Sequence, residues 1–422
     1  MADAADGQRL LLAARWACLA LIASLPLGRV GVLLGGFWMV LSDAVFLGTA
    51  ALAALAAATG QLRLRWHPFF WLLIFYFFAL ALSAAWSPDP ARSGVKLASQ
   101  AYLLSLPVLM WLLIPAGGWL KRAAAIWVAA GALLGVLAVV VLVLFYTERD
   151  HGLLRHTLFH YGSLPAGNYP RMSLSFGNAN MLCTYLAGVL GVVLGAQAAG
   201  WIGRRSAIVA LSGTLLAMAF TVSPGIGSAF LILGIWGWWR WRLQRPVAAW
   251  LALLTGIGGA AAFLLAASVT LAPHPNPEFR LTLPLLGEIY ASARVSLWQG
   301  SWQTFAAHPW TGAGLAQNSV AYHYLDPQGR QQFLTDAHNM YLNLAAQAGL
   351  PGLLAILFVS ADLLRRTWRS GANGAALPFA FGLGLLSALI YQGLTGSFED
   401  ARHLWVLLGM FLVAEHNMRC GG

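Results

Sequence analysis

The sequence is poor in charge: Asp, Glu, Lys and Arg make up 9% of its 422 residues, against about 25% in an ordinary soluble domain. With so little charge the chain cannot cover a water-facing surface, which excludes a set of soluble domains. Cysteine is also scarce, and Cys18, Cys183 and Cys420 are too scattered for a disulfide scaffold or a zinc site. No basic run is longer than two residues, so a nucleic-acid partner would find no docking patch.

Apolar residues dominate instead. They form 59% of the chain, and its mean hydropathy is +0.70. A helix needs roughly 20 apolar residues to cross a bilayer core. We therefore predict an all-α fold, a polytopic transmembrane helical bundle of about 12 spans that forms one integral-membrane domain over residues 1–422. The predicted spans lie near residues 10–27, 31–59, 68–86, 97–115, 120–147, 179–199, 204–222, 224–240, 246–272, 350–367, 374–395 and 402–418.

The second of these runs, 31–59, is too long for one straight crossing. It also carries Asp43 and the pair Gly35-Gly36. A tilt, a kink, or a short half-helix before the true span would each account for the extra length. Asp43 is costly inside a membrane, and a structural partner and a functional role are equally open for it.

The net charge of +11 is explained by topology, because the cytoplasmic loops of membrane proteins collect Lys and Arg. With a cytoplasmic N-terminus, 15 of the 25 basic residues lie on inner segments, although the outer segments contain most of the loop length. This predicts a multi-pass protein with both termini in the cytoplasm. The inner cations are Arg9, Arg15, Arg63, Arg65, Lys121, Arg122, Arg204, Arg205, Arg240, Arg242, Arg245, Arg365, Arg366, Arg369 and Arg419.

Two outer loops are long, near residues 148–178 and 273–349. Connections of that length are usually functional or disordered. The loop at 273–349, between spans 9 and 10, keeps several aromatic residues, which favours an ordered, functional loop. Its hydrophobic periodicity predicts two helices, 289–307 and 337–348.

The second of these helices carries the first candidate for catalysis. Asp336 or Thr335 is expected to cap it, which places His338 in its first turn. There the helix dipole disfavours the imidazolium and keeps the ring neutral. A neutral imidazole flanked by Asp336 and Asn339 is a reasonable general base. The plainer alternative, for this and the other outer histidines, is that polar residues gather in the longest loops.

Three motif segments follow one another on the outer side. Residues 171–186 contain Arg171 and then Phe176-Gly177-Asn178-Ala179-Asn180, which opens a span. Residues 294–318 contain Arg294 and Trp298, followed by His308-Pro309-Trp310-Thr311-Gly312-Ala313-Gly314-Leu315. Residues 338–352 read His-Asn-Met-Tyr-Leu-Asn-Leu-Ala-Ala-Gln-Ala-Gly-Leu-Pro-Gly. Together they resemble the bacterial O-antigen ligase and O-antigen polymerase family, in which an H-N-x-Y-L…G-L-P-G segment follows an R…W…H-P…G-x-G segment.

The resemblance covers about residues 171–365 and departs from the family pattern at two places. Family members often carry S-R-G near the middle of the chain, where this sequence reads Ser223-Pro224-Gly225. The phosphate-binding role of that arginine therefore has no counterpart at this position. Family members also often have proline between the two asparagines, where this chain has Ala179.

The resemblance implies a glycosyltransferase with a polyprenyl-pyrophosphate-linked glycan donor. As an O-antigen ligase of the bacterial inner membrane, it would act in lipopolysaccharide biosynthesis on the periplasmic side. The donor would be O-antigen on undecaprenyl pyrophosphate, and the acceptor a sugar hydroxyl of the lipid A–core oligosaccharide. His338 would be the general base and Arg171 and Arg294 would bind the pyrophosphate, because guanidinium groups match phosphate oxygens bidentately. In-line attack would invert the anomeric carbon.

Further residues are given supporting roles. Asn339 either orients His338, binds sugar or satisfies the helix start, and Asn180 belongs to the weaker N-x-N motif. Tyr341 lies on an apolar helical face, which favours packing over substrate contact. The sequence contains no D-x-D, and Glu148-Arg149-Asp150 is better explained as a solvated loop with a local ion pair. We therefore expect neither a metal site nor a cofactor.

Three alternatives stay open. An O-antigen polymerase would use the same donor chemistry with a second repeat unit as acceptor. Protein O-oligosaccharyltransferases are related, but many carry a long C-terminal soluble region that is not expected here. A transporter or flippase for a polyprenyl-linked glycan is the non-enzyme alternative, and it would favour repeated halves and charges at mid-membrane. The concentration of polar residues on one side favours the enzyme.

Overall fold

The computed structural model confirms the all-α class. It describes residues 8–34, 37–115, 117–147, 159–161, 170–270, 280–283, 287–325, 331–396 and 400–420. The described residues contain 13 α-helices, and their strands form small open sheets of two or three strands. The chain is therefore a helical polytopic membrane protein, as its composition predicts.

Each of the twelve predicted spans coincides with a helix. By length and apolar composition, seven helices of the described residues could cross a membrane by themselves, and these are α3, α5, α6, α8, α11, α13 and α14. The twelve helices are α2 (Arg9–Ser24), α3 (Leu41–Ala58), α4 (Phe70–Ala85), α5 (Pro90–Leu113), α6 (Gly118–Thr147), α8 (Ala179–Ala198), α9 (Arg204–Phe220), α10 (Gly227–Trp241), α11 (Pro246–Ser268), α13 (Met340–Ala372), α14 (Ala376–Thr395) and α15 (Arg402–Cys420).

The structure of the long apolar run 31–59 differs from our prediction. It contains an antiparallel hairpin of β1 (Gly31–Leu34) and β2 (Phe37–Val40), and only then the helix α3. A tilt, a kink and a half-helix are therefore all wrong explanations. An apolar run can satisfy its backbone groups by strand pairing as well as by helix formation, and apolar composition alone does not distinguish the two. Asp43 lies in the first turn of α3, where its carboxylate pairs with Arg402 at 2.9 Å.

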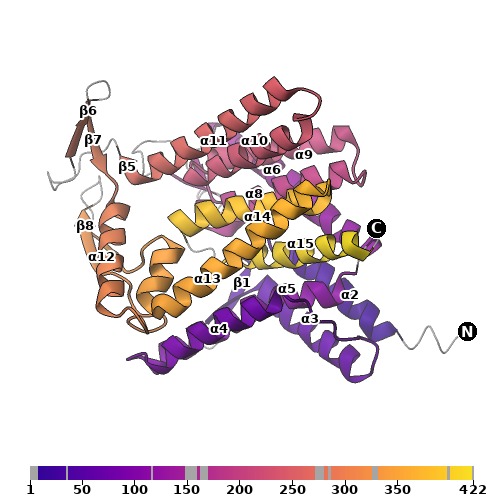
Figure 1. The fold of residues 1–422 in the computed structure, drawn as a ribbon, viewed down its shortest axis with the longest axis horizontal. Helices are drawn as coiled ribbons and strands as arrows, with labels where there is room; N and C mark the ends of the chain where they lie inside the picture. The colour runs from indigo at the N-terminus through magenta and orange to yellow at the C-terminus, as the bar shows by residue number, and fades with distance from the viewer. Residues whose placement is uncertain are drawn as a thin grey trace, which may run out of the picture.

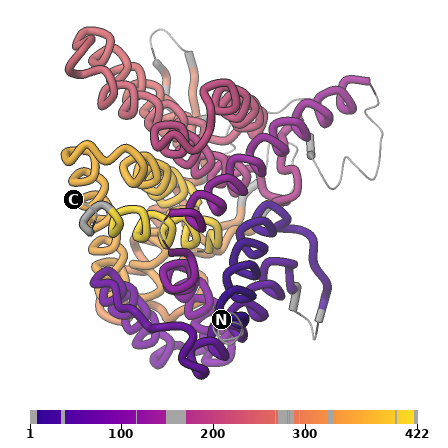
Figure 2. The backbone as a smooth tube through the Cα atoms, turned by 90° about the vertical axis from the view of Figure 1, so that its right-hand side faces the viewer, coloured from indigo at the N-terminus to yellow at the C-terminus, as the bar shows by residue number. Residues whose placement is uncertain are grey.

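The centre of the bundle is formed by α8 and α14. In their most apolar 18-residue stretches, 89% and 78% of the residues are buried. Glycines bring their backbones together: a Cβ at Gly191 would lie 2.6 Å from the carbonyl oxygen of Ala380. Small residues allow this close approach between transmembrane helices. Figures 1 and 2 show the C-terminal helices between the N-terminal group and the pair α10–α11, which pack on each other through Gly234 and Gly256.

The bundle has two distinct ends. Figure 1 shows both chain termini at one end and, at the opposite end, the strands β6 (Arg280–Leu283) and β7 (Gly287–Ala291) with helix α12 (Ala293–Ala307). We call the latter the loop end. It also carries the strands β3 (Phe159–Tyr161), β4 (Pro170–Met172), β5 (Val269–Thr270), β8 (Tyr322–Leu325) and β9 (Gln331–Leu334).

The two helices predicted in the loop 273–349 are present in modified form. The first, α12, starts at Ala293 rather than 289 and ends before His308, as expected. The second is the beginning of α13, which continues into the tenth span across a break at Gly349, where φ is 64° and ψ is −161°. The predicted end of this helix after residue 348 is therefore a kink between two helical segments.

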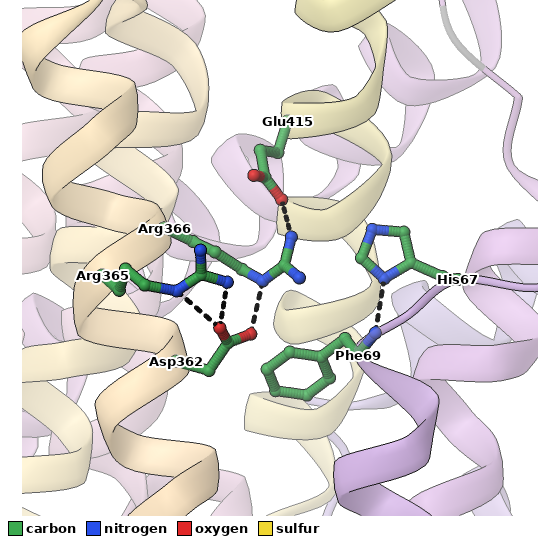
Figure 3. Close-up of polar contacts among 6 residues, drawn as sticks. All are labelled: His67, Phe69, Asp362, Arg365, Arg366 and Glu415. Carbon is green, nitrogen blue, oxygen red and sulfur yellow. Dashed lines mark hydrogen bonds and ion pairs between the residues drawn. The ribbon is translucent and has the colours of Figure 1, made fainter.

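At the terminal end, a buried ion pair joins α13 to α15. Figure 3 shows Arg366 between Asp362, on its own helix, and Glu415, on α15. The Arg366 Nη1 to Glu415 Oε2 distance is 2.7 Å, and the two side chains are 6% and 5% exposed. The guanidinium also lies over the ring of Phe69, 5.7 Å from its centroid. Three helices, α4, α13 and α15, thus meet at one charged group.

Candidate active site

The start of α13 determines where His338 lies. Its N-cap is Asn339, whose side-chain oxygen accepts hydrogen bonds from the backbone N–H groups of Tyr341 (3.1 Å) and Leu342 (3.2 Å). The predicted caps, Asp336 and Thr335, are therefore wrong, and His338 precedes the helix instead of occupying its first turn. Asn and Asp are about equally good caps, so the sequence does not discriminate between them. Of the roles left open for Asn339, the structure shows the capping one.

The backbone at His338 is unusual. Its φ is +46°, a region that few residues other than glycine adopt. Asp336 holds this conformation, because its Oδ1 accepts the backbone N–H of His338. The same carboxylate oxygen lies 3.4 Å from the His338 Nδ1. Asp336 thus orients the ring through Nδ1 and leaves Nε2 as the nitrogen that can take a proton from a substrate.

Asp336 is itself positioned by Asn343, a buried residue to which sequence analysis gave no site role. The Asn343 side chain donates to Asp336 Oδ2 at 3.5 Å and accepts from the Ser319 hydroxyl at 2.6 Å and from the backbone N–H of Ala337 at 3.3 Å. The sequence spacing could have indicated this role, because Asn343 lies four residues after Asn339, on the polar face of the helix. The loop before α13 is therefore tied to the helix by an amide.

Arg294, in the first turn of α12, acts on His338 electrostatically. The pKa of His338 is lowered from its ordinary 6.5, first because burial disfavours the imidazolium and further because the Arg294 guanidinium repels it, while Asp336 works in the opposite direction. The predicted neutral ring is thus supported, but burial rather than the helix dipole is the main cause. The structure brings together two of the residues that the sequence proposed for catalysis and donor binding.

This arrangement predicts the pH dependence of the activity. If neutral His338 is the base, kcat/KM falls as the pH drops through the His338 pKa, so the midpoint of this acidic limb is expected below 6.5. Replacing Asp336 with asparagine removes the charge that favours the imidazolium and should shift the midpoint to still lower pH. Replacing Arg294 with glutamine should shift it upward. A pH–rate profile of each variant measures both directions, and an unchanged midpoint in both would contradict the assignment.

Arg171 lies in a second polar group, at the loop-end terminus of α8. Its Nη2 is 3.5 Å from the side-chain oxygen of Asn180, and its Nε donates to the carbonyl of Thr221 at 3.4 Å. The Ser223 hydroxyl donates to the same Asn180 oxygen at 2.9 Å. Two predicted site residues, Arg171 and Asn180, are therefore in contact. The Ser223-Pro224-Gly225 segment, which lacks the family arginine, packs against them.

Arg29 is a further cation of this group that sequence analysis did not assign. A Cβ at Gly177 would overlap the Arg29 guanidinium, and the Arg29 backbone N–H donates to the carbonyl of Ser175 at 2.9 Å. Gly177 has a φ of 68°, which only glycine adopts without strain. The glycine of the Phe-Gly-Asn motif thus makes room for an arginine beside the start of α8. No sequence signal linked residues so far apart.

The end of α14 connects the two polar groups. Gln392 accepts from the Thr184 hydroxyl of α8 at 3.0 Å, one turn beyond Asn180. The next residue, Gly393, packs against the ring of Tyr341, since a Cβ there would lie 2.9 Å from the Tyr341 Cε2. The Tyr341 ring therefore packs against the end of α14.

The glycine-rich motif after α12 packs against the backbone of α13 near the site. The kink at Gly349 frees carbonyls of α13, and the loop 308–315 binds them. The N–H groups of Ala313 and Gly314 donate to the carbonyls of Ala346 (2.8 Å) and Gln347 (3.1 Å). A Cβ at Gly312 would lie 2.2 Å from the backbone of Gln347. The two family motifs therefore form one backbone clamp that fixes the first segment of α13, and with it His338.

Among the described residues, no group of three or more His, Cys, Asp or Glu side chains is placed to hold a metal ion. The site consists instead of one histidine–aspartate pair, arginines and amides. Together with the apolar helices, it defines a polytopic helical membrane protein with a polar site at one end of the bundle. No curated protein matches the chain.

The comparison with family models gives a more particular likeness. Residues 207–357, a little over a third of the chain, match the family model described as O-antigen ligase. The predicted resemblance is thereby confirmed over these residues, in which the chain is similar to O-antigen ligases. The matched segment includes Arg294 and His338, whereas Arg171 and Asn180 lie before it.

Proposed function

We propose that this protein is an O-antigen ligase, which transfers a glycan from undecaprenyl pyrophosphate to a sugar hydroxyl of lipid A–core in lipopolysaccharide biosynthesis. The observation that carries the proposal is His338, which contacts Asp336 and has a pKa lowered by burial and by the charge of Arg294. It lies at the loop end of a membrane bundle, in the part of the sequence that matches this family model. The loop end would face the periplasm of the bacterial inner membrane, and both termini would face the cytoplasm.

The proposed chemistry is one displacement. The Nε2 of His338 takes the proton of the acceptor hydroxyl, whose oxygen forms the new bond to the anomeric carbon of the donor sugar. The bond from that carbon to the pyrophosphate oxygen breaks, and the lipid pyrophosphate leaves with an added negative charge. Attack opposite to the leaving group inverts the anomeric configuration. No residue becomes covalently attached to the sugar, and neither a metal nor a cofactor takes part.

The charge that develops on the leaving group calls for fixed cations. Arg294 is near the proposed base, and Arg171 and Arg29 lie at the loop-end terminus of α8. That terminus is also the positive end of the helix dipole, a favourable place for phosphate groups. We propose that Arg294 and Arg171 bind the donor pyrophosphate, with Arg29 contributing to the same field.

A reconstituted transfer reaction tests this proposal. Purified protein is given a polyprenyl-pyrophosphate glycan together with lipid A–core, in excess chelator. We expect glycan on lipid A–core, with an inverted anomeric linkage and without loss of rate from chelation. Activity that returns only with Mg²⁺ or Mn²⁺ would contradict the metal-independent chemistry.

The same reaction separates the alternatives. With a second donor molecule in place of lipid A–core, a lengthened donor glycan would identify an O-antigen polymerase. If neither acceptor receives the glycan, but lipid-linked glycan moves between the leaflets of a vesicle that contains the protein, a transporter is identified instead.

A further inference from the structure

A cavity at the loop end lies next to the proposed base. Its volume is about 540 Å³, within the usual range of small-molecule sites. It is lined by residues of α4, α5, the segment 315–318 and the first segment of α13. Asp336, which orients His338 through Nδ1, is one of its lining residues. A molecule in this cavity can therefore contact the carboxylate that orients the proposed base.

The most unusual lining residue is Gln100 of α5. It lies about 15 Å along the helix from its first residue, by the helical rise per residue, and its side chain is 0% exposed. The side-chain N–H donates to Asp400 Oδ1 at 3.1 Å, which fixes the amide orientation because a carboxylate can only accept. The Oε1 atom then has no hydrogen-bond partner among the described residues.

An unpartnered buried carbonyl needs a donor. A hydroxyl can supply a hydrogen to the Gln100 Oε1, whereas an ionised phosphate oxygen has none to give. A polar side chain deep in a membrane protein is also costly, and such residues face functional cavities as a rule. Gln100 therefore indicates a ligand that carries hydroxyl groups.

The charges of the cavity agree with an uncharged ligand. Its lining contains two cations, Arg92 and Lys96, and two carboxylates, Asp336 and Asp400. Lys96 Nζ lies 2.7 Å from Asp400 Oδ1, so one of the two cations and one of the two carboxylates form an ion pair. This balance gives no net attraction for a pyrophosphate. The remaining polar groups are amides and the hydroxyls of Tyr76, Ser99 and Thr335. Both kinds of group donate and accept, as recognition of sugar hydroxyls requires.

We propose that this cavity, which we call the α4–α5 cavity, is the binding site for the acceptor sugar. The proposal rests on the proposed transferase function. The proton that His338 removes belongs to the acceptor, so the acceptor ring must lie beside the base. The pyrophosphate lies on the cation side, at Arg294. Gln100 accepts a hydrogen bond from a hydroxyl that does not react, which orients the reactive one toward His338.

Equilibrium binding tests this assignment without relying on catalysis. The full-length protein in detergent is titrated with lipid-free core oligosaccharide, and separately with the free oligosaccharide of the donor. The wild-type protein is expected to bind the core oligosaccharide. Gln100→Met, which keeps the volume but removes both amide groups, should weaken this binding about tenfold or more, the effect of one unpaired hydrogen bond.

Two further variants keep the test decisive. Gln197→Met makes the same change on an exposed residue at the other end of α8 and should bind core oligosaccharide as the wild type does. Arg92→Gln, at an exposed position of the cavity lining, should weaken binding even if the buried Gln100 variant fails to fold.

In steady-state transfer, the cavity variants should raise the KM for lipid A–core and leave the KM for the donor unchanged. Wild-type protein that does not bind core oligosaccharide, or cavity variants that bind it normally, would overturn the proposal. So would preferential binding of the donor oligosaccharide, or a rise in the donor KM alone. Core oligosaccharide binding without any transfer would instead support the cavity and refute the transferase function.

Discussion

Replacing His338 with alanine is expected to slow glycan transfer by about 10²–10⁴-fold, the usual contribution of a general base. The reason is that the acceptor hydroxyl would have to lose its proton to water as the new bond forms. Binding of the donor should persist, because the proposed pyrophosphate contacts are on Arg294 and Arg171. The effect should therefore appear in kcat, with little change in the KM for the donor, in steady-state transfer by the purified variant.

A matched control uses His323, an exposed histidine of β8 that stacks on Phe333. Its replacement by alanine should leave transfer within about twofold, as expected for a surface position away from the site. His338→Gln retains a hydrogen-bonding side chain without a base of suitable pKa, so it should be nearly as slow as the alanine variant. Near-normal turnover by either His338 variant would refute the general-base assignment.

The helices could be predicted because the length of an apolar run is a local property. All twelve predicted spans coincide with helices, since a helix satisfies its own backbone hydrogen bonds wherever it lies. The hairpin at residues 31–40 could not be predicted in this way. Its strands are as apolar as the neighbouring helix, and what distinguishes them is the pairing of Gly31–Leu34 with Phe37–Val40.

The candidate-site residues that lie in short sequence motifs could be predicted. His338, Arg294 and the Gly349 break all lie in short segments, and the structure places the first two close enough to interact. The exact start of α13 was not predictable, because the choice between Asp336 and Asn339 as cap depends on the hydrogen bond that Asp336 makes to the His338 backbone. That bond exists only once the loop has folded.

Contacts between distant segments were beyond sequence reasoning altogether. The pair of Asp43 with Arg402 and the contact of Gln100 with Asp400 join residues about 300 or more positions apart. Each of these residues was visible as a polar group in an apolar chain, but its partner was not. A single sequence contains no information on which of many outer charges a given carboxylate will meet.

Replacing Arg366 with leucine is expected to lower the free energy of unfolding by about 3–5 kcal/mol, because it leaves the buried Glu415 without its arginine partner. Arg365→Leu is the matched control: Arg365 pairs with the same Asp362, but its side chain is 45% exposed, so the cost should stay below about 1 kcal/mol. Unfolding by a denaturing detergent in mixed micelles measures both.

A double-mutant cycle tests the physical reason for that cost. In the wild-type background, Glu415→Gln should destabilise the protein, because it weakens a buried charged hydrogen bond to Arg366. In the Arg366→Leu background the same replacement should stabilise it, because it removes a buried carboxylate that has lost its arginine. The sign of the Glu415→Gln effect thus reverses between the two backgrounds. An equal effect in both would show that Arg366 and Glu415 contribute independently, and that the charged group does not lock α13 to α15.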